Sequence, residues 1–214
     1  MASWIIHLRV AEKIQRVFPQ LSAKDFYIGS MAPDSGNIGS DGVLVPPYHL
    51  SHWLDPQTKE SHHTAFYETY AAPCQETGGR SFYLGYYAHL LTDQLWARDI
   101  YRPRKTQYAA ELAADPSFMN KIKRDWYVSD RLFLNEYPDY GPYALIRATK
   151  TYQAPALSYY TSEMICAKIA AAVAYYESME TEKPPAFLAF SMYAAQEFVD
   201  RAADTINAGL TDKI

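Results

Sequence analysis

Apolar residues recur at three- and four-residue intervals over most of this chain, and this spacing predicts a helical protein. The first such segment, Trp4 to Phe18, carries apolar side chains at Ile6, Val10, Ile14, Val17 and Phe18. Because a helix completes a turn in about 3.6 residues, these positions share one face. A second helix is expected to follow Ser22, a residue type that caps helix starts, and to end near Met31.

The pattern changes between Ala32 and Lys59, where glycines and prolines interrupt any regular spacing. These residues are Pro33, Gly36, Gly39, Gly42, Pro46, Pro47 and Pro56. A long stretch without secondary structure of its own is uncommon inside a compact domain and is usually functional or disordered. Since this one also carries Asp34, His49 and His52, we interpret it as a long loop that forms a metal site.

Helical spacing resumes after the loop, and no convincing strand alternation interrupts it. Further helices are expected at about 60–71, 80–100, 106–114, 116–135, 140–152, 159–180 and 185–208. The last two carry apolar stripes, around Ile169 and Val173 and around Met192 and Val199, that are typical of core faces. The sequence therefore predicts an all-α fold, with a single helical domain over residues 1–214.

Composition narrows the class of protein. The chain has 214 residues, of which 49% are hydrophobic, enough to bury one substantial core. Its net charge of -4 argues against binding a nucleic-acid duplex, whose phosphates attract clustered Lys and Arg. No apolar run approaches the roughly 18 residues of a transmembrane segment, and charged residues near the start are unlike a signal peptide. Cys74 and Cys166 lie far apart, so free thiols and a cytoplasmic location are expected.

Candidate metal chemistry is concentrated early in the chain, because all six histidines lie in the first 89 residues. His89 and Asp93 are four residues apart, so on a helix they share a face. They are either a core histidine hydrogen-bonded to a carboxylate or two ligands of one metal ion. The full candidate set is His7, Asp34, His52, His89 and Asp93, with His49 as an alternative to His52. These imidazole and carboxylate donors suit zinc, iron or manganese.

In their order along the chain, these residues resemble the zinc-dependent phospholipase C family, which is related to the P1-type nucleases. The resemblance spans roughly residues 1–100 and rests on His7, the run from Gly29 to Asp34, Ser51-His52-Trp53 and His89-x-x-x-Asp93. It implies an all-helical fold of the phospholipase C / P1 nuclease type, a cluster of up to three metals and hydrolysis of a phosphoester. Residues 101–214 are then expected to supply packing helices.

Carried over by position, the resemblance makes Asp34, His52, His89 and Asp93 the ligands of one metal. His7 then helps to hold another, with Asp93 as a candidate bridge. The family places further histidines after this motif, whereas no histidine follows His89 here, and Asp99 is an alternative ligand.

Two further roles are open. Asp34 is a candidate general base as well as a ligand. Arg98 follows the motif closely and is either a phosphate-binding residue or part of a solvated helix end.

The expected function is therefore a metal-dependent hydrolase of a small-molecule phosphoester, either a phosphodiester or a phospholipid-like compound, acting through a metal-activated water. The alternative is a noncatalytic helical module in which a structural metal fastens the loop to the helices. The lack of histidines after His89 favours this alternative.

Overall fold

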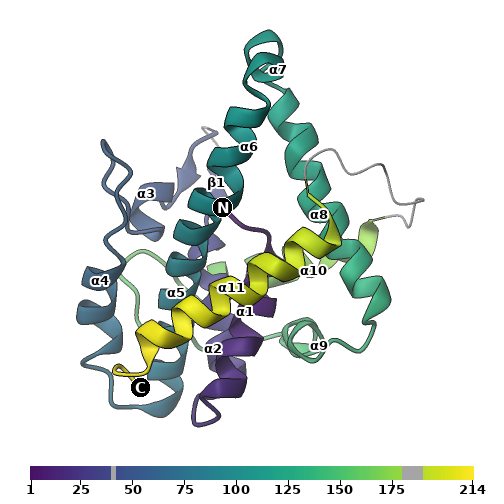
Figure 1. Cartoon of the computed structure of the whole chain (residues 1–214). Helices are drawn as coiled ribbons and strands as arrows, with labels where there is room; N and C mark the ends of the chain where they lie inside the picture. Colours follow the sequence, from purple (N-terminus) through teal and green to yellow (C-terminus); the bar gives the residue numbers. More distant parts are fainter. Residues whose placement is uncertain (40–41, 180–189) are drawn as a thin grey trace.

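The computed structural model describes residues 1–39, 42–179 and 190–214. Within these ranges the protein is mostly helical, as the apolar spacing predicts. The longest helices are α1 (Trp4–Val17), α5 (Thr77–Trp96), α8 (Phe118–Glu136), α10 (Ser162–Ser178) and α11 (Met192–Leu210). Figure 1 shows α11 lying across α1 and α5, and α11 packs against both.

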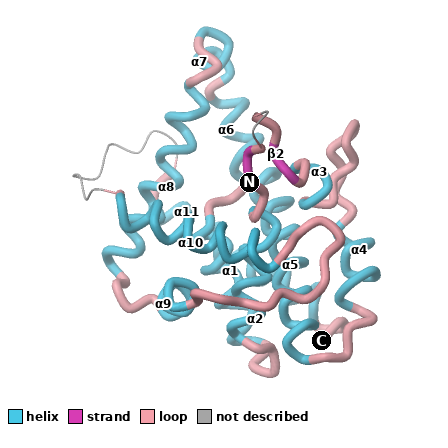
Figure 2. Tube along the Cα trace, turned by 180° about the vertical axis from the view of Figure 1, so that it is seen from behind, coloured by secondary structure: helices cyan, strands magenta, loops and turns pink. Residues whose placement is uncertain are grey.

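Shorter helices complete the body of the protein. They are α2 (Ala23–Met31), α4 (His63–Phe66), α6 (Arg102–Gln107), α7 (Ala109–Ala114) and α9 (Gly141–Ala148). Two π-helical turns extend helices: η2 (Tyr67–Ala71) follows α4, and η3 (Ala97–Tyr101) joins α5 to α6. Figures 1 and 2 show α7 at the tip of a projection formed with α6 and α8. A continuous helical path therefore leads from the core along α5 and out through η3 and α6.

The segment predicted to be one long loop contains several short elements. They are the 3-10 turn η1 (Ala32–Asp34), strands β1 (Asn37–Ile38) and β2 (Leu44–Val45), and the single helical turn α3 (Tyr48–Ser51). The two strands pair antiparallel, with Asn37 opposite Val45, and β2 lies near α3 in Figure 2. The prediction of a segment without secondary structure is therefore wrong, because elements of two to four residues are too short to show a repeating pattern.

Several helix ends differ from their predicted positions. The helix predicted from 80 begins earlier, at Thr77, because the Glu76 carboxylate accepts hydrogen bonds from the backbone N–H groups of Gly78 and Gly79. The helix predicted over 106–114 begins at 102 and divides at Tyr108 into α6 and α7. The helix predicted over 140–152 ends at Ala148. The last helix begins at Met192, while residues 185–189 of that prediction lie outside the described residues.

Two glycines allow the backbones of α2 and α5 to touch. A Cβ placed on Gly29 would lie 2.0 Å from the carbonyl oxygen of Phe82, and one on Gly85 would lie 2.1 Å from that of Phe26. These distances are far below van der Waals contact, so the packing requires glycine at both positions. The close approach sets the end of α2 beside the middle of α5, which carries His89.

The hydrophobic core draws on both halves of the chain. Trp96 of α5 is fully buried and packs edge-on against Trp126, Phe190 and Phe198, with ring centroids 4.9–5.2 Å apart. The helices after residue 101 thus supply core packing, while the assignment of residues 1–214 to one domain stays a prediction. Among the described residues, no helix combines the length and the apolar character needed to cross a membrane.

Candidate metal centre

All five candidate ligands selected from the sequence converge in the interior. His7 comes from α1, Asp34 from η1, His52 from the residue after α3, and His89 and Asp93 from successive turns of α5. Four of these residues are buried, and the Asp93 side chain is only 10% exposed. The structure therefore gathers two carboxylates and three imidazoles from four separate elements.

Four candidate ligand atoms lie at the distances expected between ligands of a single cation. His52 Nε2 lies 3.3 Å from Asp34 Oδ1, 3.4 Å from His89 Nε2 and 3.7 Å from Asp93 Oδ2. His89 Nε2 is also 3.7 Å from Asp93 Oδ2. Ligand atoms of a tetrahedral zinc site with bonds of about 2.0–2.1 Å lie about 3.3 Å apart. These four of the six edges are close to those of a tetrahedral site, and Asp34, His52 and His89 form one compact ligand group.

His7 forms a second ligand group with His89 and Asp93. Its Nε2 lies 3.4 Å from Asp93 Oδ1, the carboxylate oxygen that faces away from His52. The His7 ring stacks on His89 at 3.7 Å, with 7° between the two planes. Asp93 therefore presents one oxygen to each group, which is the arrangement of a bridging carboxylate, whereas the Nε2 lone pair of His89 can serve only one metal.

Backbone contacts orient two of the imidazoles. His89 Nδ1 lies 2.8 Å from the carbonyl oxygen of Ser30, at the closely packed junction of α2 and α5. His52 Nδ1 lies 3.2 Å from the carbonyl oxygen of Tyr48 and 2.9 Å from Ser51 Oγ. A carbonyl can only accept, so each Nδ1 carries the proton and each Nε2 offers its lone pair to the cluster.

Aromatic side chains hold the two carboxylates. Trp4 Nε1 donates to Asp34 Oδ2 at 3.0 Å, and the Tyr48 hydroxyl donates to Asp93 Oδ2 at 3.3 Å. The Tyr48 ring also stacks on His52 at 3.8 Å. Sequence analysis missed both aromatics, although each lies one helical turn before a candidate ligand. Since Trp4 donates to Oδ2 of Asp34 and Oδ1 points at the cluster, 3.3 Å from His52 Nε2, the position of Asp34 suits a ligand better than a general base.

The charges of the cluster are those that metal ligands require. Burial, together with the neighbouring His7, lowers the pKa of His89 to about 3, so this imidazole is neutral near pH 7. Burial alone would raise the pKa of Asp34, but its contact with His52, whose Nε2 lies 3.3 Å from Asp34 Oδ1, holds the pKa below its usual value. Burial is likewise outweighed at Asp93, whose pKa lies well below its usual value next to the Met1 amino group and His7. Neutral imidazoles and ionised carboxylates are the metal-binding forms.

Three buried atoms of the cluster have no hydrogen-bond partner within the described parts of the chain. They are Nδ1 and Nε2 of His7 and Oδ1 of Asp34. Leaving a buried polar atom unpaired costs about 1–3 kcal/mol. A cation bound to His7 Nε2 in one group and a cation bound to Asp34 Oδ1 in the other would offset most of this cost, so the residues present fit a metal.

The structure separates the alternative residues from the cluster. His49 lines a neighbouring cavity and Asp99 binds Arg98, and neither joins a ligand group among the described residues. Arg98 also lines that cavity, but its Nε and Nη2 lie 2.5 and 2.9 Å from the two carboxylate oxygens of Asp99. The positive charge of Arg98, the candidate phosphate-binding residue, is therefore already paired.

Two cavities reach the cluster. The larger has a volume of about 790 Å³ and is lined by His52 and Asp93. The smaller, of about 200 Å³, is lined by Asp34 and His52. Its wall includes three residues from the second half of the chain, which are Tyr127, Tyr160 and Lys168. Residues 101–214 therefore help to enclose the site in addition to packing, which the sequence did not predict.

Comparisons of this chain with family models, with curated proteins and with solved structures find no match. The resemblance to the phospholipase C family therefore stays a prediction from the sequence. The functional conclusion rests on the geometry of the cluster and of the cavities beside it.

Proposed function

We propose that this protein is a metal-dependent hydrolase of small-molecule phosphoesters, of the phospholipase C / P1 nuclease type, using zinc or another divalent metal such as iron or manganese. The observation that carries the proposal is a buried cluster in which Asp34, His52 and His89 form one ligand group and His7, His89 and Asp93 form another, beside a cavity of about 790 Å³. The two free cysteines agree with the cytoplasmic location that we also propose.

Within this proposal the two ligand groups have different tasks. Asp34, His52, His89 and Asp93 hold one cation through four protein atoms. His7 and the other oxygen of Asp93 offer few protein ligands to a second position, which leaves room there for water and substrate. A divalent cation supplies a bound water of lowered pKa and polarises a phosphoryl oxygen.

The chain's own residues then prepare the attack. His7 and Asp93 would hold the second cation, and Tyr48, whose hydroxyl lies 3.3 Å from Asp93 Oδ2, borders the cavity where the ester binds.

The test is to purify the protein without chelator and to measure bound metal and phosphoester hydrolysis on the same sample. Zinc, iron or manganese is expected at one or more ions per chain. Turnover of p-nitrophenyl phosphate or of bis(p-nitrophenyl) phosphate is expected to stop on chelation and to return when the metal is restored. His89→Ala removes one imidazole ligand from the four-ligand position, and we expect it to reduce bound metal and turnover together.

The matched control is His62→Ala, since His62 is exposed at the start of α4 and lies outside both ligand groups. This variant is expected to keep wild-type metal content and rate. Metal-free wild-type protein, or unchanged turnover in His89→Ala, would overturn the proposal. Bound metal that raises the thermal unfolding temperature while no phosphoester is hydrolysed would instead favour the structural-metal module.

A further inference from the structure

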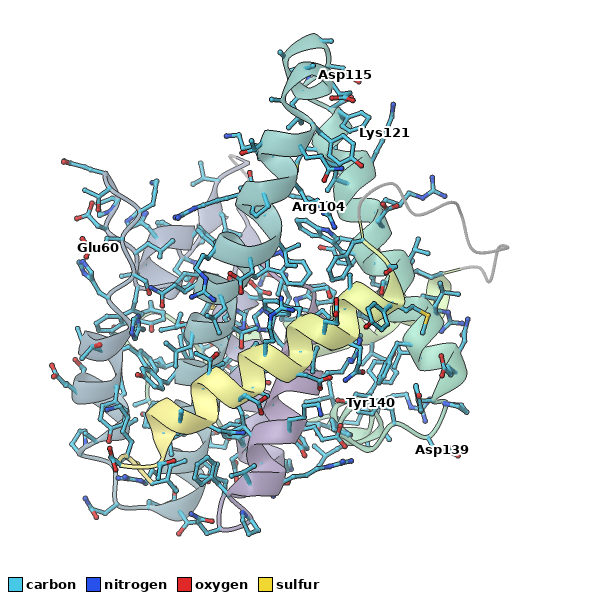
Figure 3. The ribbon with its side chains drawn as sticks, viewed as in Figure 1. Glu60, Arg104, Asp115, Lys121, Asp139 and Tyr140 are labelled. Carbon is cyan, nitrogen blue, oxygen red and sulfur yellow. The ribbon has the colours of Figure 1, made fainter. Side chains whose placement is uncertain are left out.

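Basic side chains gather in the wall of the larger cavity, beyond the metal cluster. The basic residues that line it are Lys59, Arg98, Arg102 and Lys105. The acidic lining residues are Glu60, which Figure 3 shows across from α6, and Asp93 of the cluster itself. Away from the cluster, four cationic groups therefore face one carboxylate, and the cavity attracts anions even without a metal.

Two of these cations are already engaged. Arg98 is paired with Asp99, and Lys59 Nζ donates to the carbonyl oxygen of Pro56 at 2.6 Å. The side chains of Arg102 and Lys105 form no hydrogen bond or ion pair with any residue that the structure describes. These two, one turn apart on α6, are therefore the charges available to a ligand.

The π-helical turn η3 places these charges on the cavity side. In an uninterrupted α-helix, Arg102 lies nine residues after Asp93 and would point about 180° away from it. The five residues of η3 stand between them and change the helical phase. As a result Asp93, Arg102 and Lys105 all line the same cavity.

The space between the cluster and these charges is largely apolar. It is lined by Leu54, Leu90, Ala97 and Tyr101. Arg102 lies about 13 Å along the helix axis from Asp93. Since helical side chains lean towards the amino end, its guanidinium comes to roughly 10 Å from the cluster. A ligand that contacts both needs an apolar body of about that length.

From this arrangement we infer that the cavity binds a substrate with two anionic groups. The scissile phosphoester lies at the metal cluster, and a second anion, phosphate or carboxylate, lies between Arg102 and Lys105, with an apolar spacer between the two. The inference rests on the proposed hydrolase function and names its substrate class. Water adds to phosphorus, the ester P–O bond breaks, and the alcohol that carries the second anion leaves with a proton.

The experiment compares three substrates that share one spacer: 1,6-hexanediol bisphosphate, 6-phosphohexanoate and hexyl phosphate. Release of inorganic phosphate is measured for the wild type and for the double variant Arg102→Ala/Lys105→Ala. The double variant is expected to raise KM at least tenfold for the bisphosphate, with kcat within twofold. The 6-phosphohexanoate arm shows whether a carboxylate replaces the second phosphate. For hexyl phosphate both constants are expected to stay within twofold of wild type.

Two further variants separate a charge effect from a structural one. Arg104→Ala lies on the same helix, outside the cavity lining, and its guanidinium binds Gln107 at 2.7 Å. We expect it to leave all three substrates unaffected. Arg102→Lys/Lys105→Arg keeps both charges and is expected to restore most of the bisphosphate affinity.

Calorimetric titration with the bisphosphate distinguishes failure of the inference from failure of the proposed function. Binding that depends on Arg102 and Lys105 without hydrolysis of any of the three compounds would overturn the hydrolase and leave the anion site standing. Hydrolysis with equal kcat/KM for all three, or an equal loss for all three in the double variant, would overturn the inference alone. Neither binding nor hydrolysis would overturn both.

Discussion

The buried carboxyl groups of the metal cluster and the buried carboxyl group of Asp130 have pKa values shifted in opposite directions. Asp34 and Asp93 lie among imidazoles, and their pKa values fall below the usual value. Asp130 of α8 accepts hydrogen bonds from Ser3 Oγ at 2.8 Å and Tyr176 OH at 2.5 Å, and burial raises its pKa to about 7. Burial by itself would raise the pKa of all three carboxyl groups. The neighbouring groups therefore decide whether each pKa ends above or below its usual value.

The comparison shows what distinguishes a metal centre from a polar patch in the core. Hydroxyl groups satisfy Asp130 as hydrogen-bond donors, and a protonated carboxyl needs no cation. The Met1 amino group and His7 at Asp93, and His52 at Asp34, keep these carboxylates ionised, while ligand atoms of the cluster are left without partners among the described residues. Helix α1 serves both groups, because Ser3 donates to Asp130 while Trp4 donates to Asp34 and His7 faces Asp93.

The largest expected difference in metal affinity is between a variant that removes a carboxylate from the metal cluster and one that removes the carboxylate of Asp130. Asp93→Asn takes a ligand from both metal groups, and we expect it to weaken metal binding about 1000-fold, or about 4 kcal/mol. Asp130→Asn removes a buried carboxylate outside the ligand groups and is expected to change metal affinity less than threefold. Titration against a competing chelator measures both. Equal losses in the two variants would contradict the distinction between the groups.

The next largest effect is expected on the free energy of unfolding. It comes from disturbing the packing of α2 against α5, which positions His89 and does not involve Asp130. Gly85→Ala drives a methyl group into the Phe26 carbonyl, and we expect it to lower the free energy of unfolding by about 3 kcal/mol. Urea denaturation measures the loss. The matched control is Gly209→Ala in α11, where an added Cβ meets nothing within 4 Å, and this variant is expected to be neutral or slightly stabilising. Wild-type stability in Gly85→Ala would show that α2 and α5 can separate at little cost.

A smaller effect is visible in the pH dependence of stability. The Asp130 pKa is raised, so its contribution to stability is present below the unfolded pKa near 4 and is lost as the pH rises towards about 7. The amide side chain in the Asp130→Asn variant does not titrate. Its stability relative to wild type is therefore expected to rise by about 2 kcal/mol between pH 5 and 7 and to stay level above that. Urea denaturation at several pH values measures the difference.

The lowered pKa values of Asp34 and Asp93 make stability depend on pH in the opposite direction. Their contribution to stability is present above pH 4 and is lost as the pH falls further.

A stability difference between Asp130→Asn and wild type that stays constant from pH 4 to 8 would show that Asp130 is ionised throughout that range.

The smallest effect tests an outer partner of the metal cluster. Trp4→Phe removes the indole N–H that donates to Asp34 Oδ2, and we expect metal affinity to fall about tenfold. Trp53→Phe is the matched control, since its indole N–H donates to the Tyr159 hydroxyl and lies outside the ligand groups. Competition with a chelator measures both variants. The same affinity in both would show that Trp4 acts only by packing.

The helices and the ligand residues could be predicted because their signals are local. His89 and Asp93 lie one turn apart in an apolar stretch, and such a polar pair stands out without knowledge of the fold. His52 was separable from His49 only in three dimensions, since both lie in a segment without a repeating pattern. There the backbone of α3 turns the His52 ring into the core and leaves His49 in the cavity wall.

The features that the sequence did not predict depend on contacts between distant segments. Trp4 acquires its role from Asp34, thirty residues away, and Tyr127, Tyr160 and Lys168 enclose a cavity that no local pattern marks. Glu76 caps α5 although glutamate is not a typical capping residue. The phospholipase C resemblance, which the comparisons leave as a prediction, guided the choice of ligands but gave no information about these neighbours.

The π-helical turn η3 separates the two kinds of residue that a binding site needs. His89 and Asp93 precede it, while Arg102 and Lys105 follow it on the same continuous helical path. Deleting one residue from η3 would change the rotational phase of α6 relative to α5. A single insertion or deletion at η3 would therefore redirect Arg102 and Lys105 without altering any of the five residues that form the metal cluster.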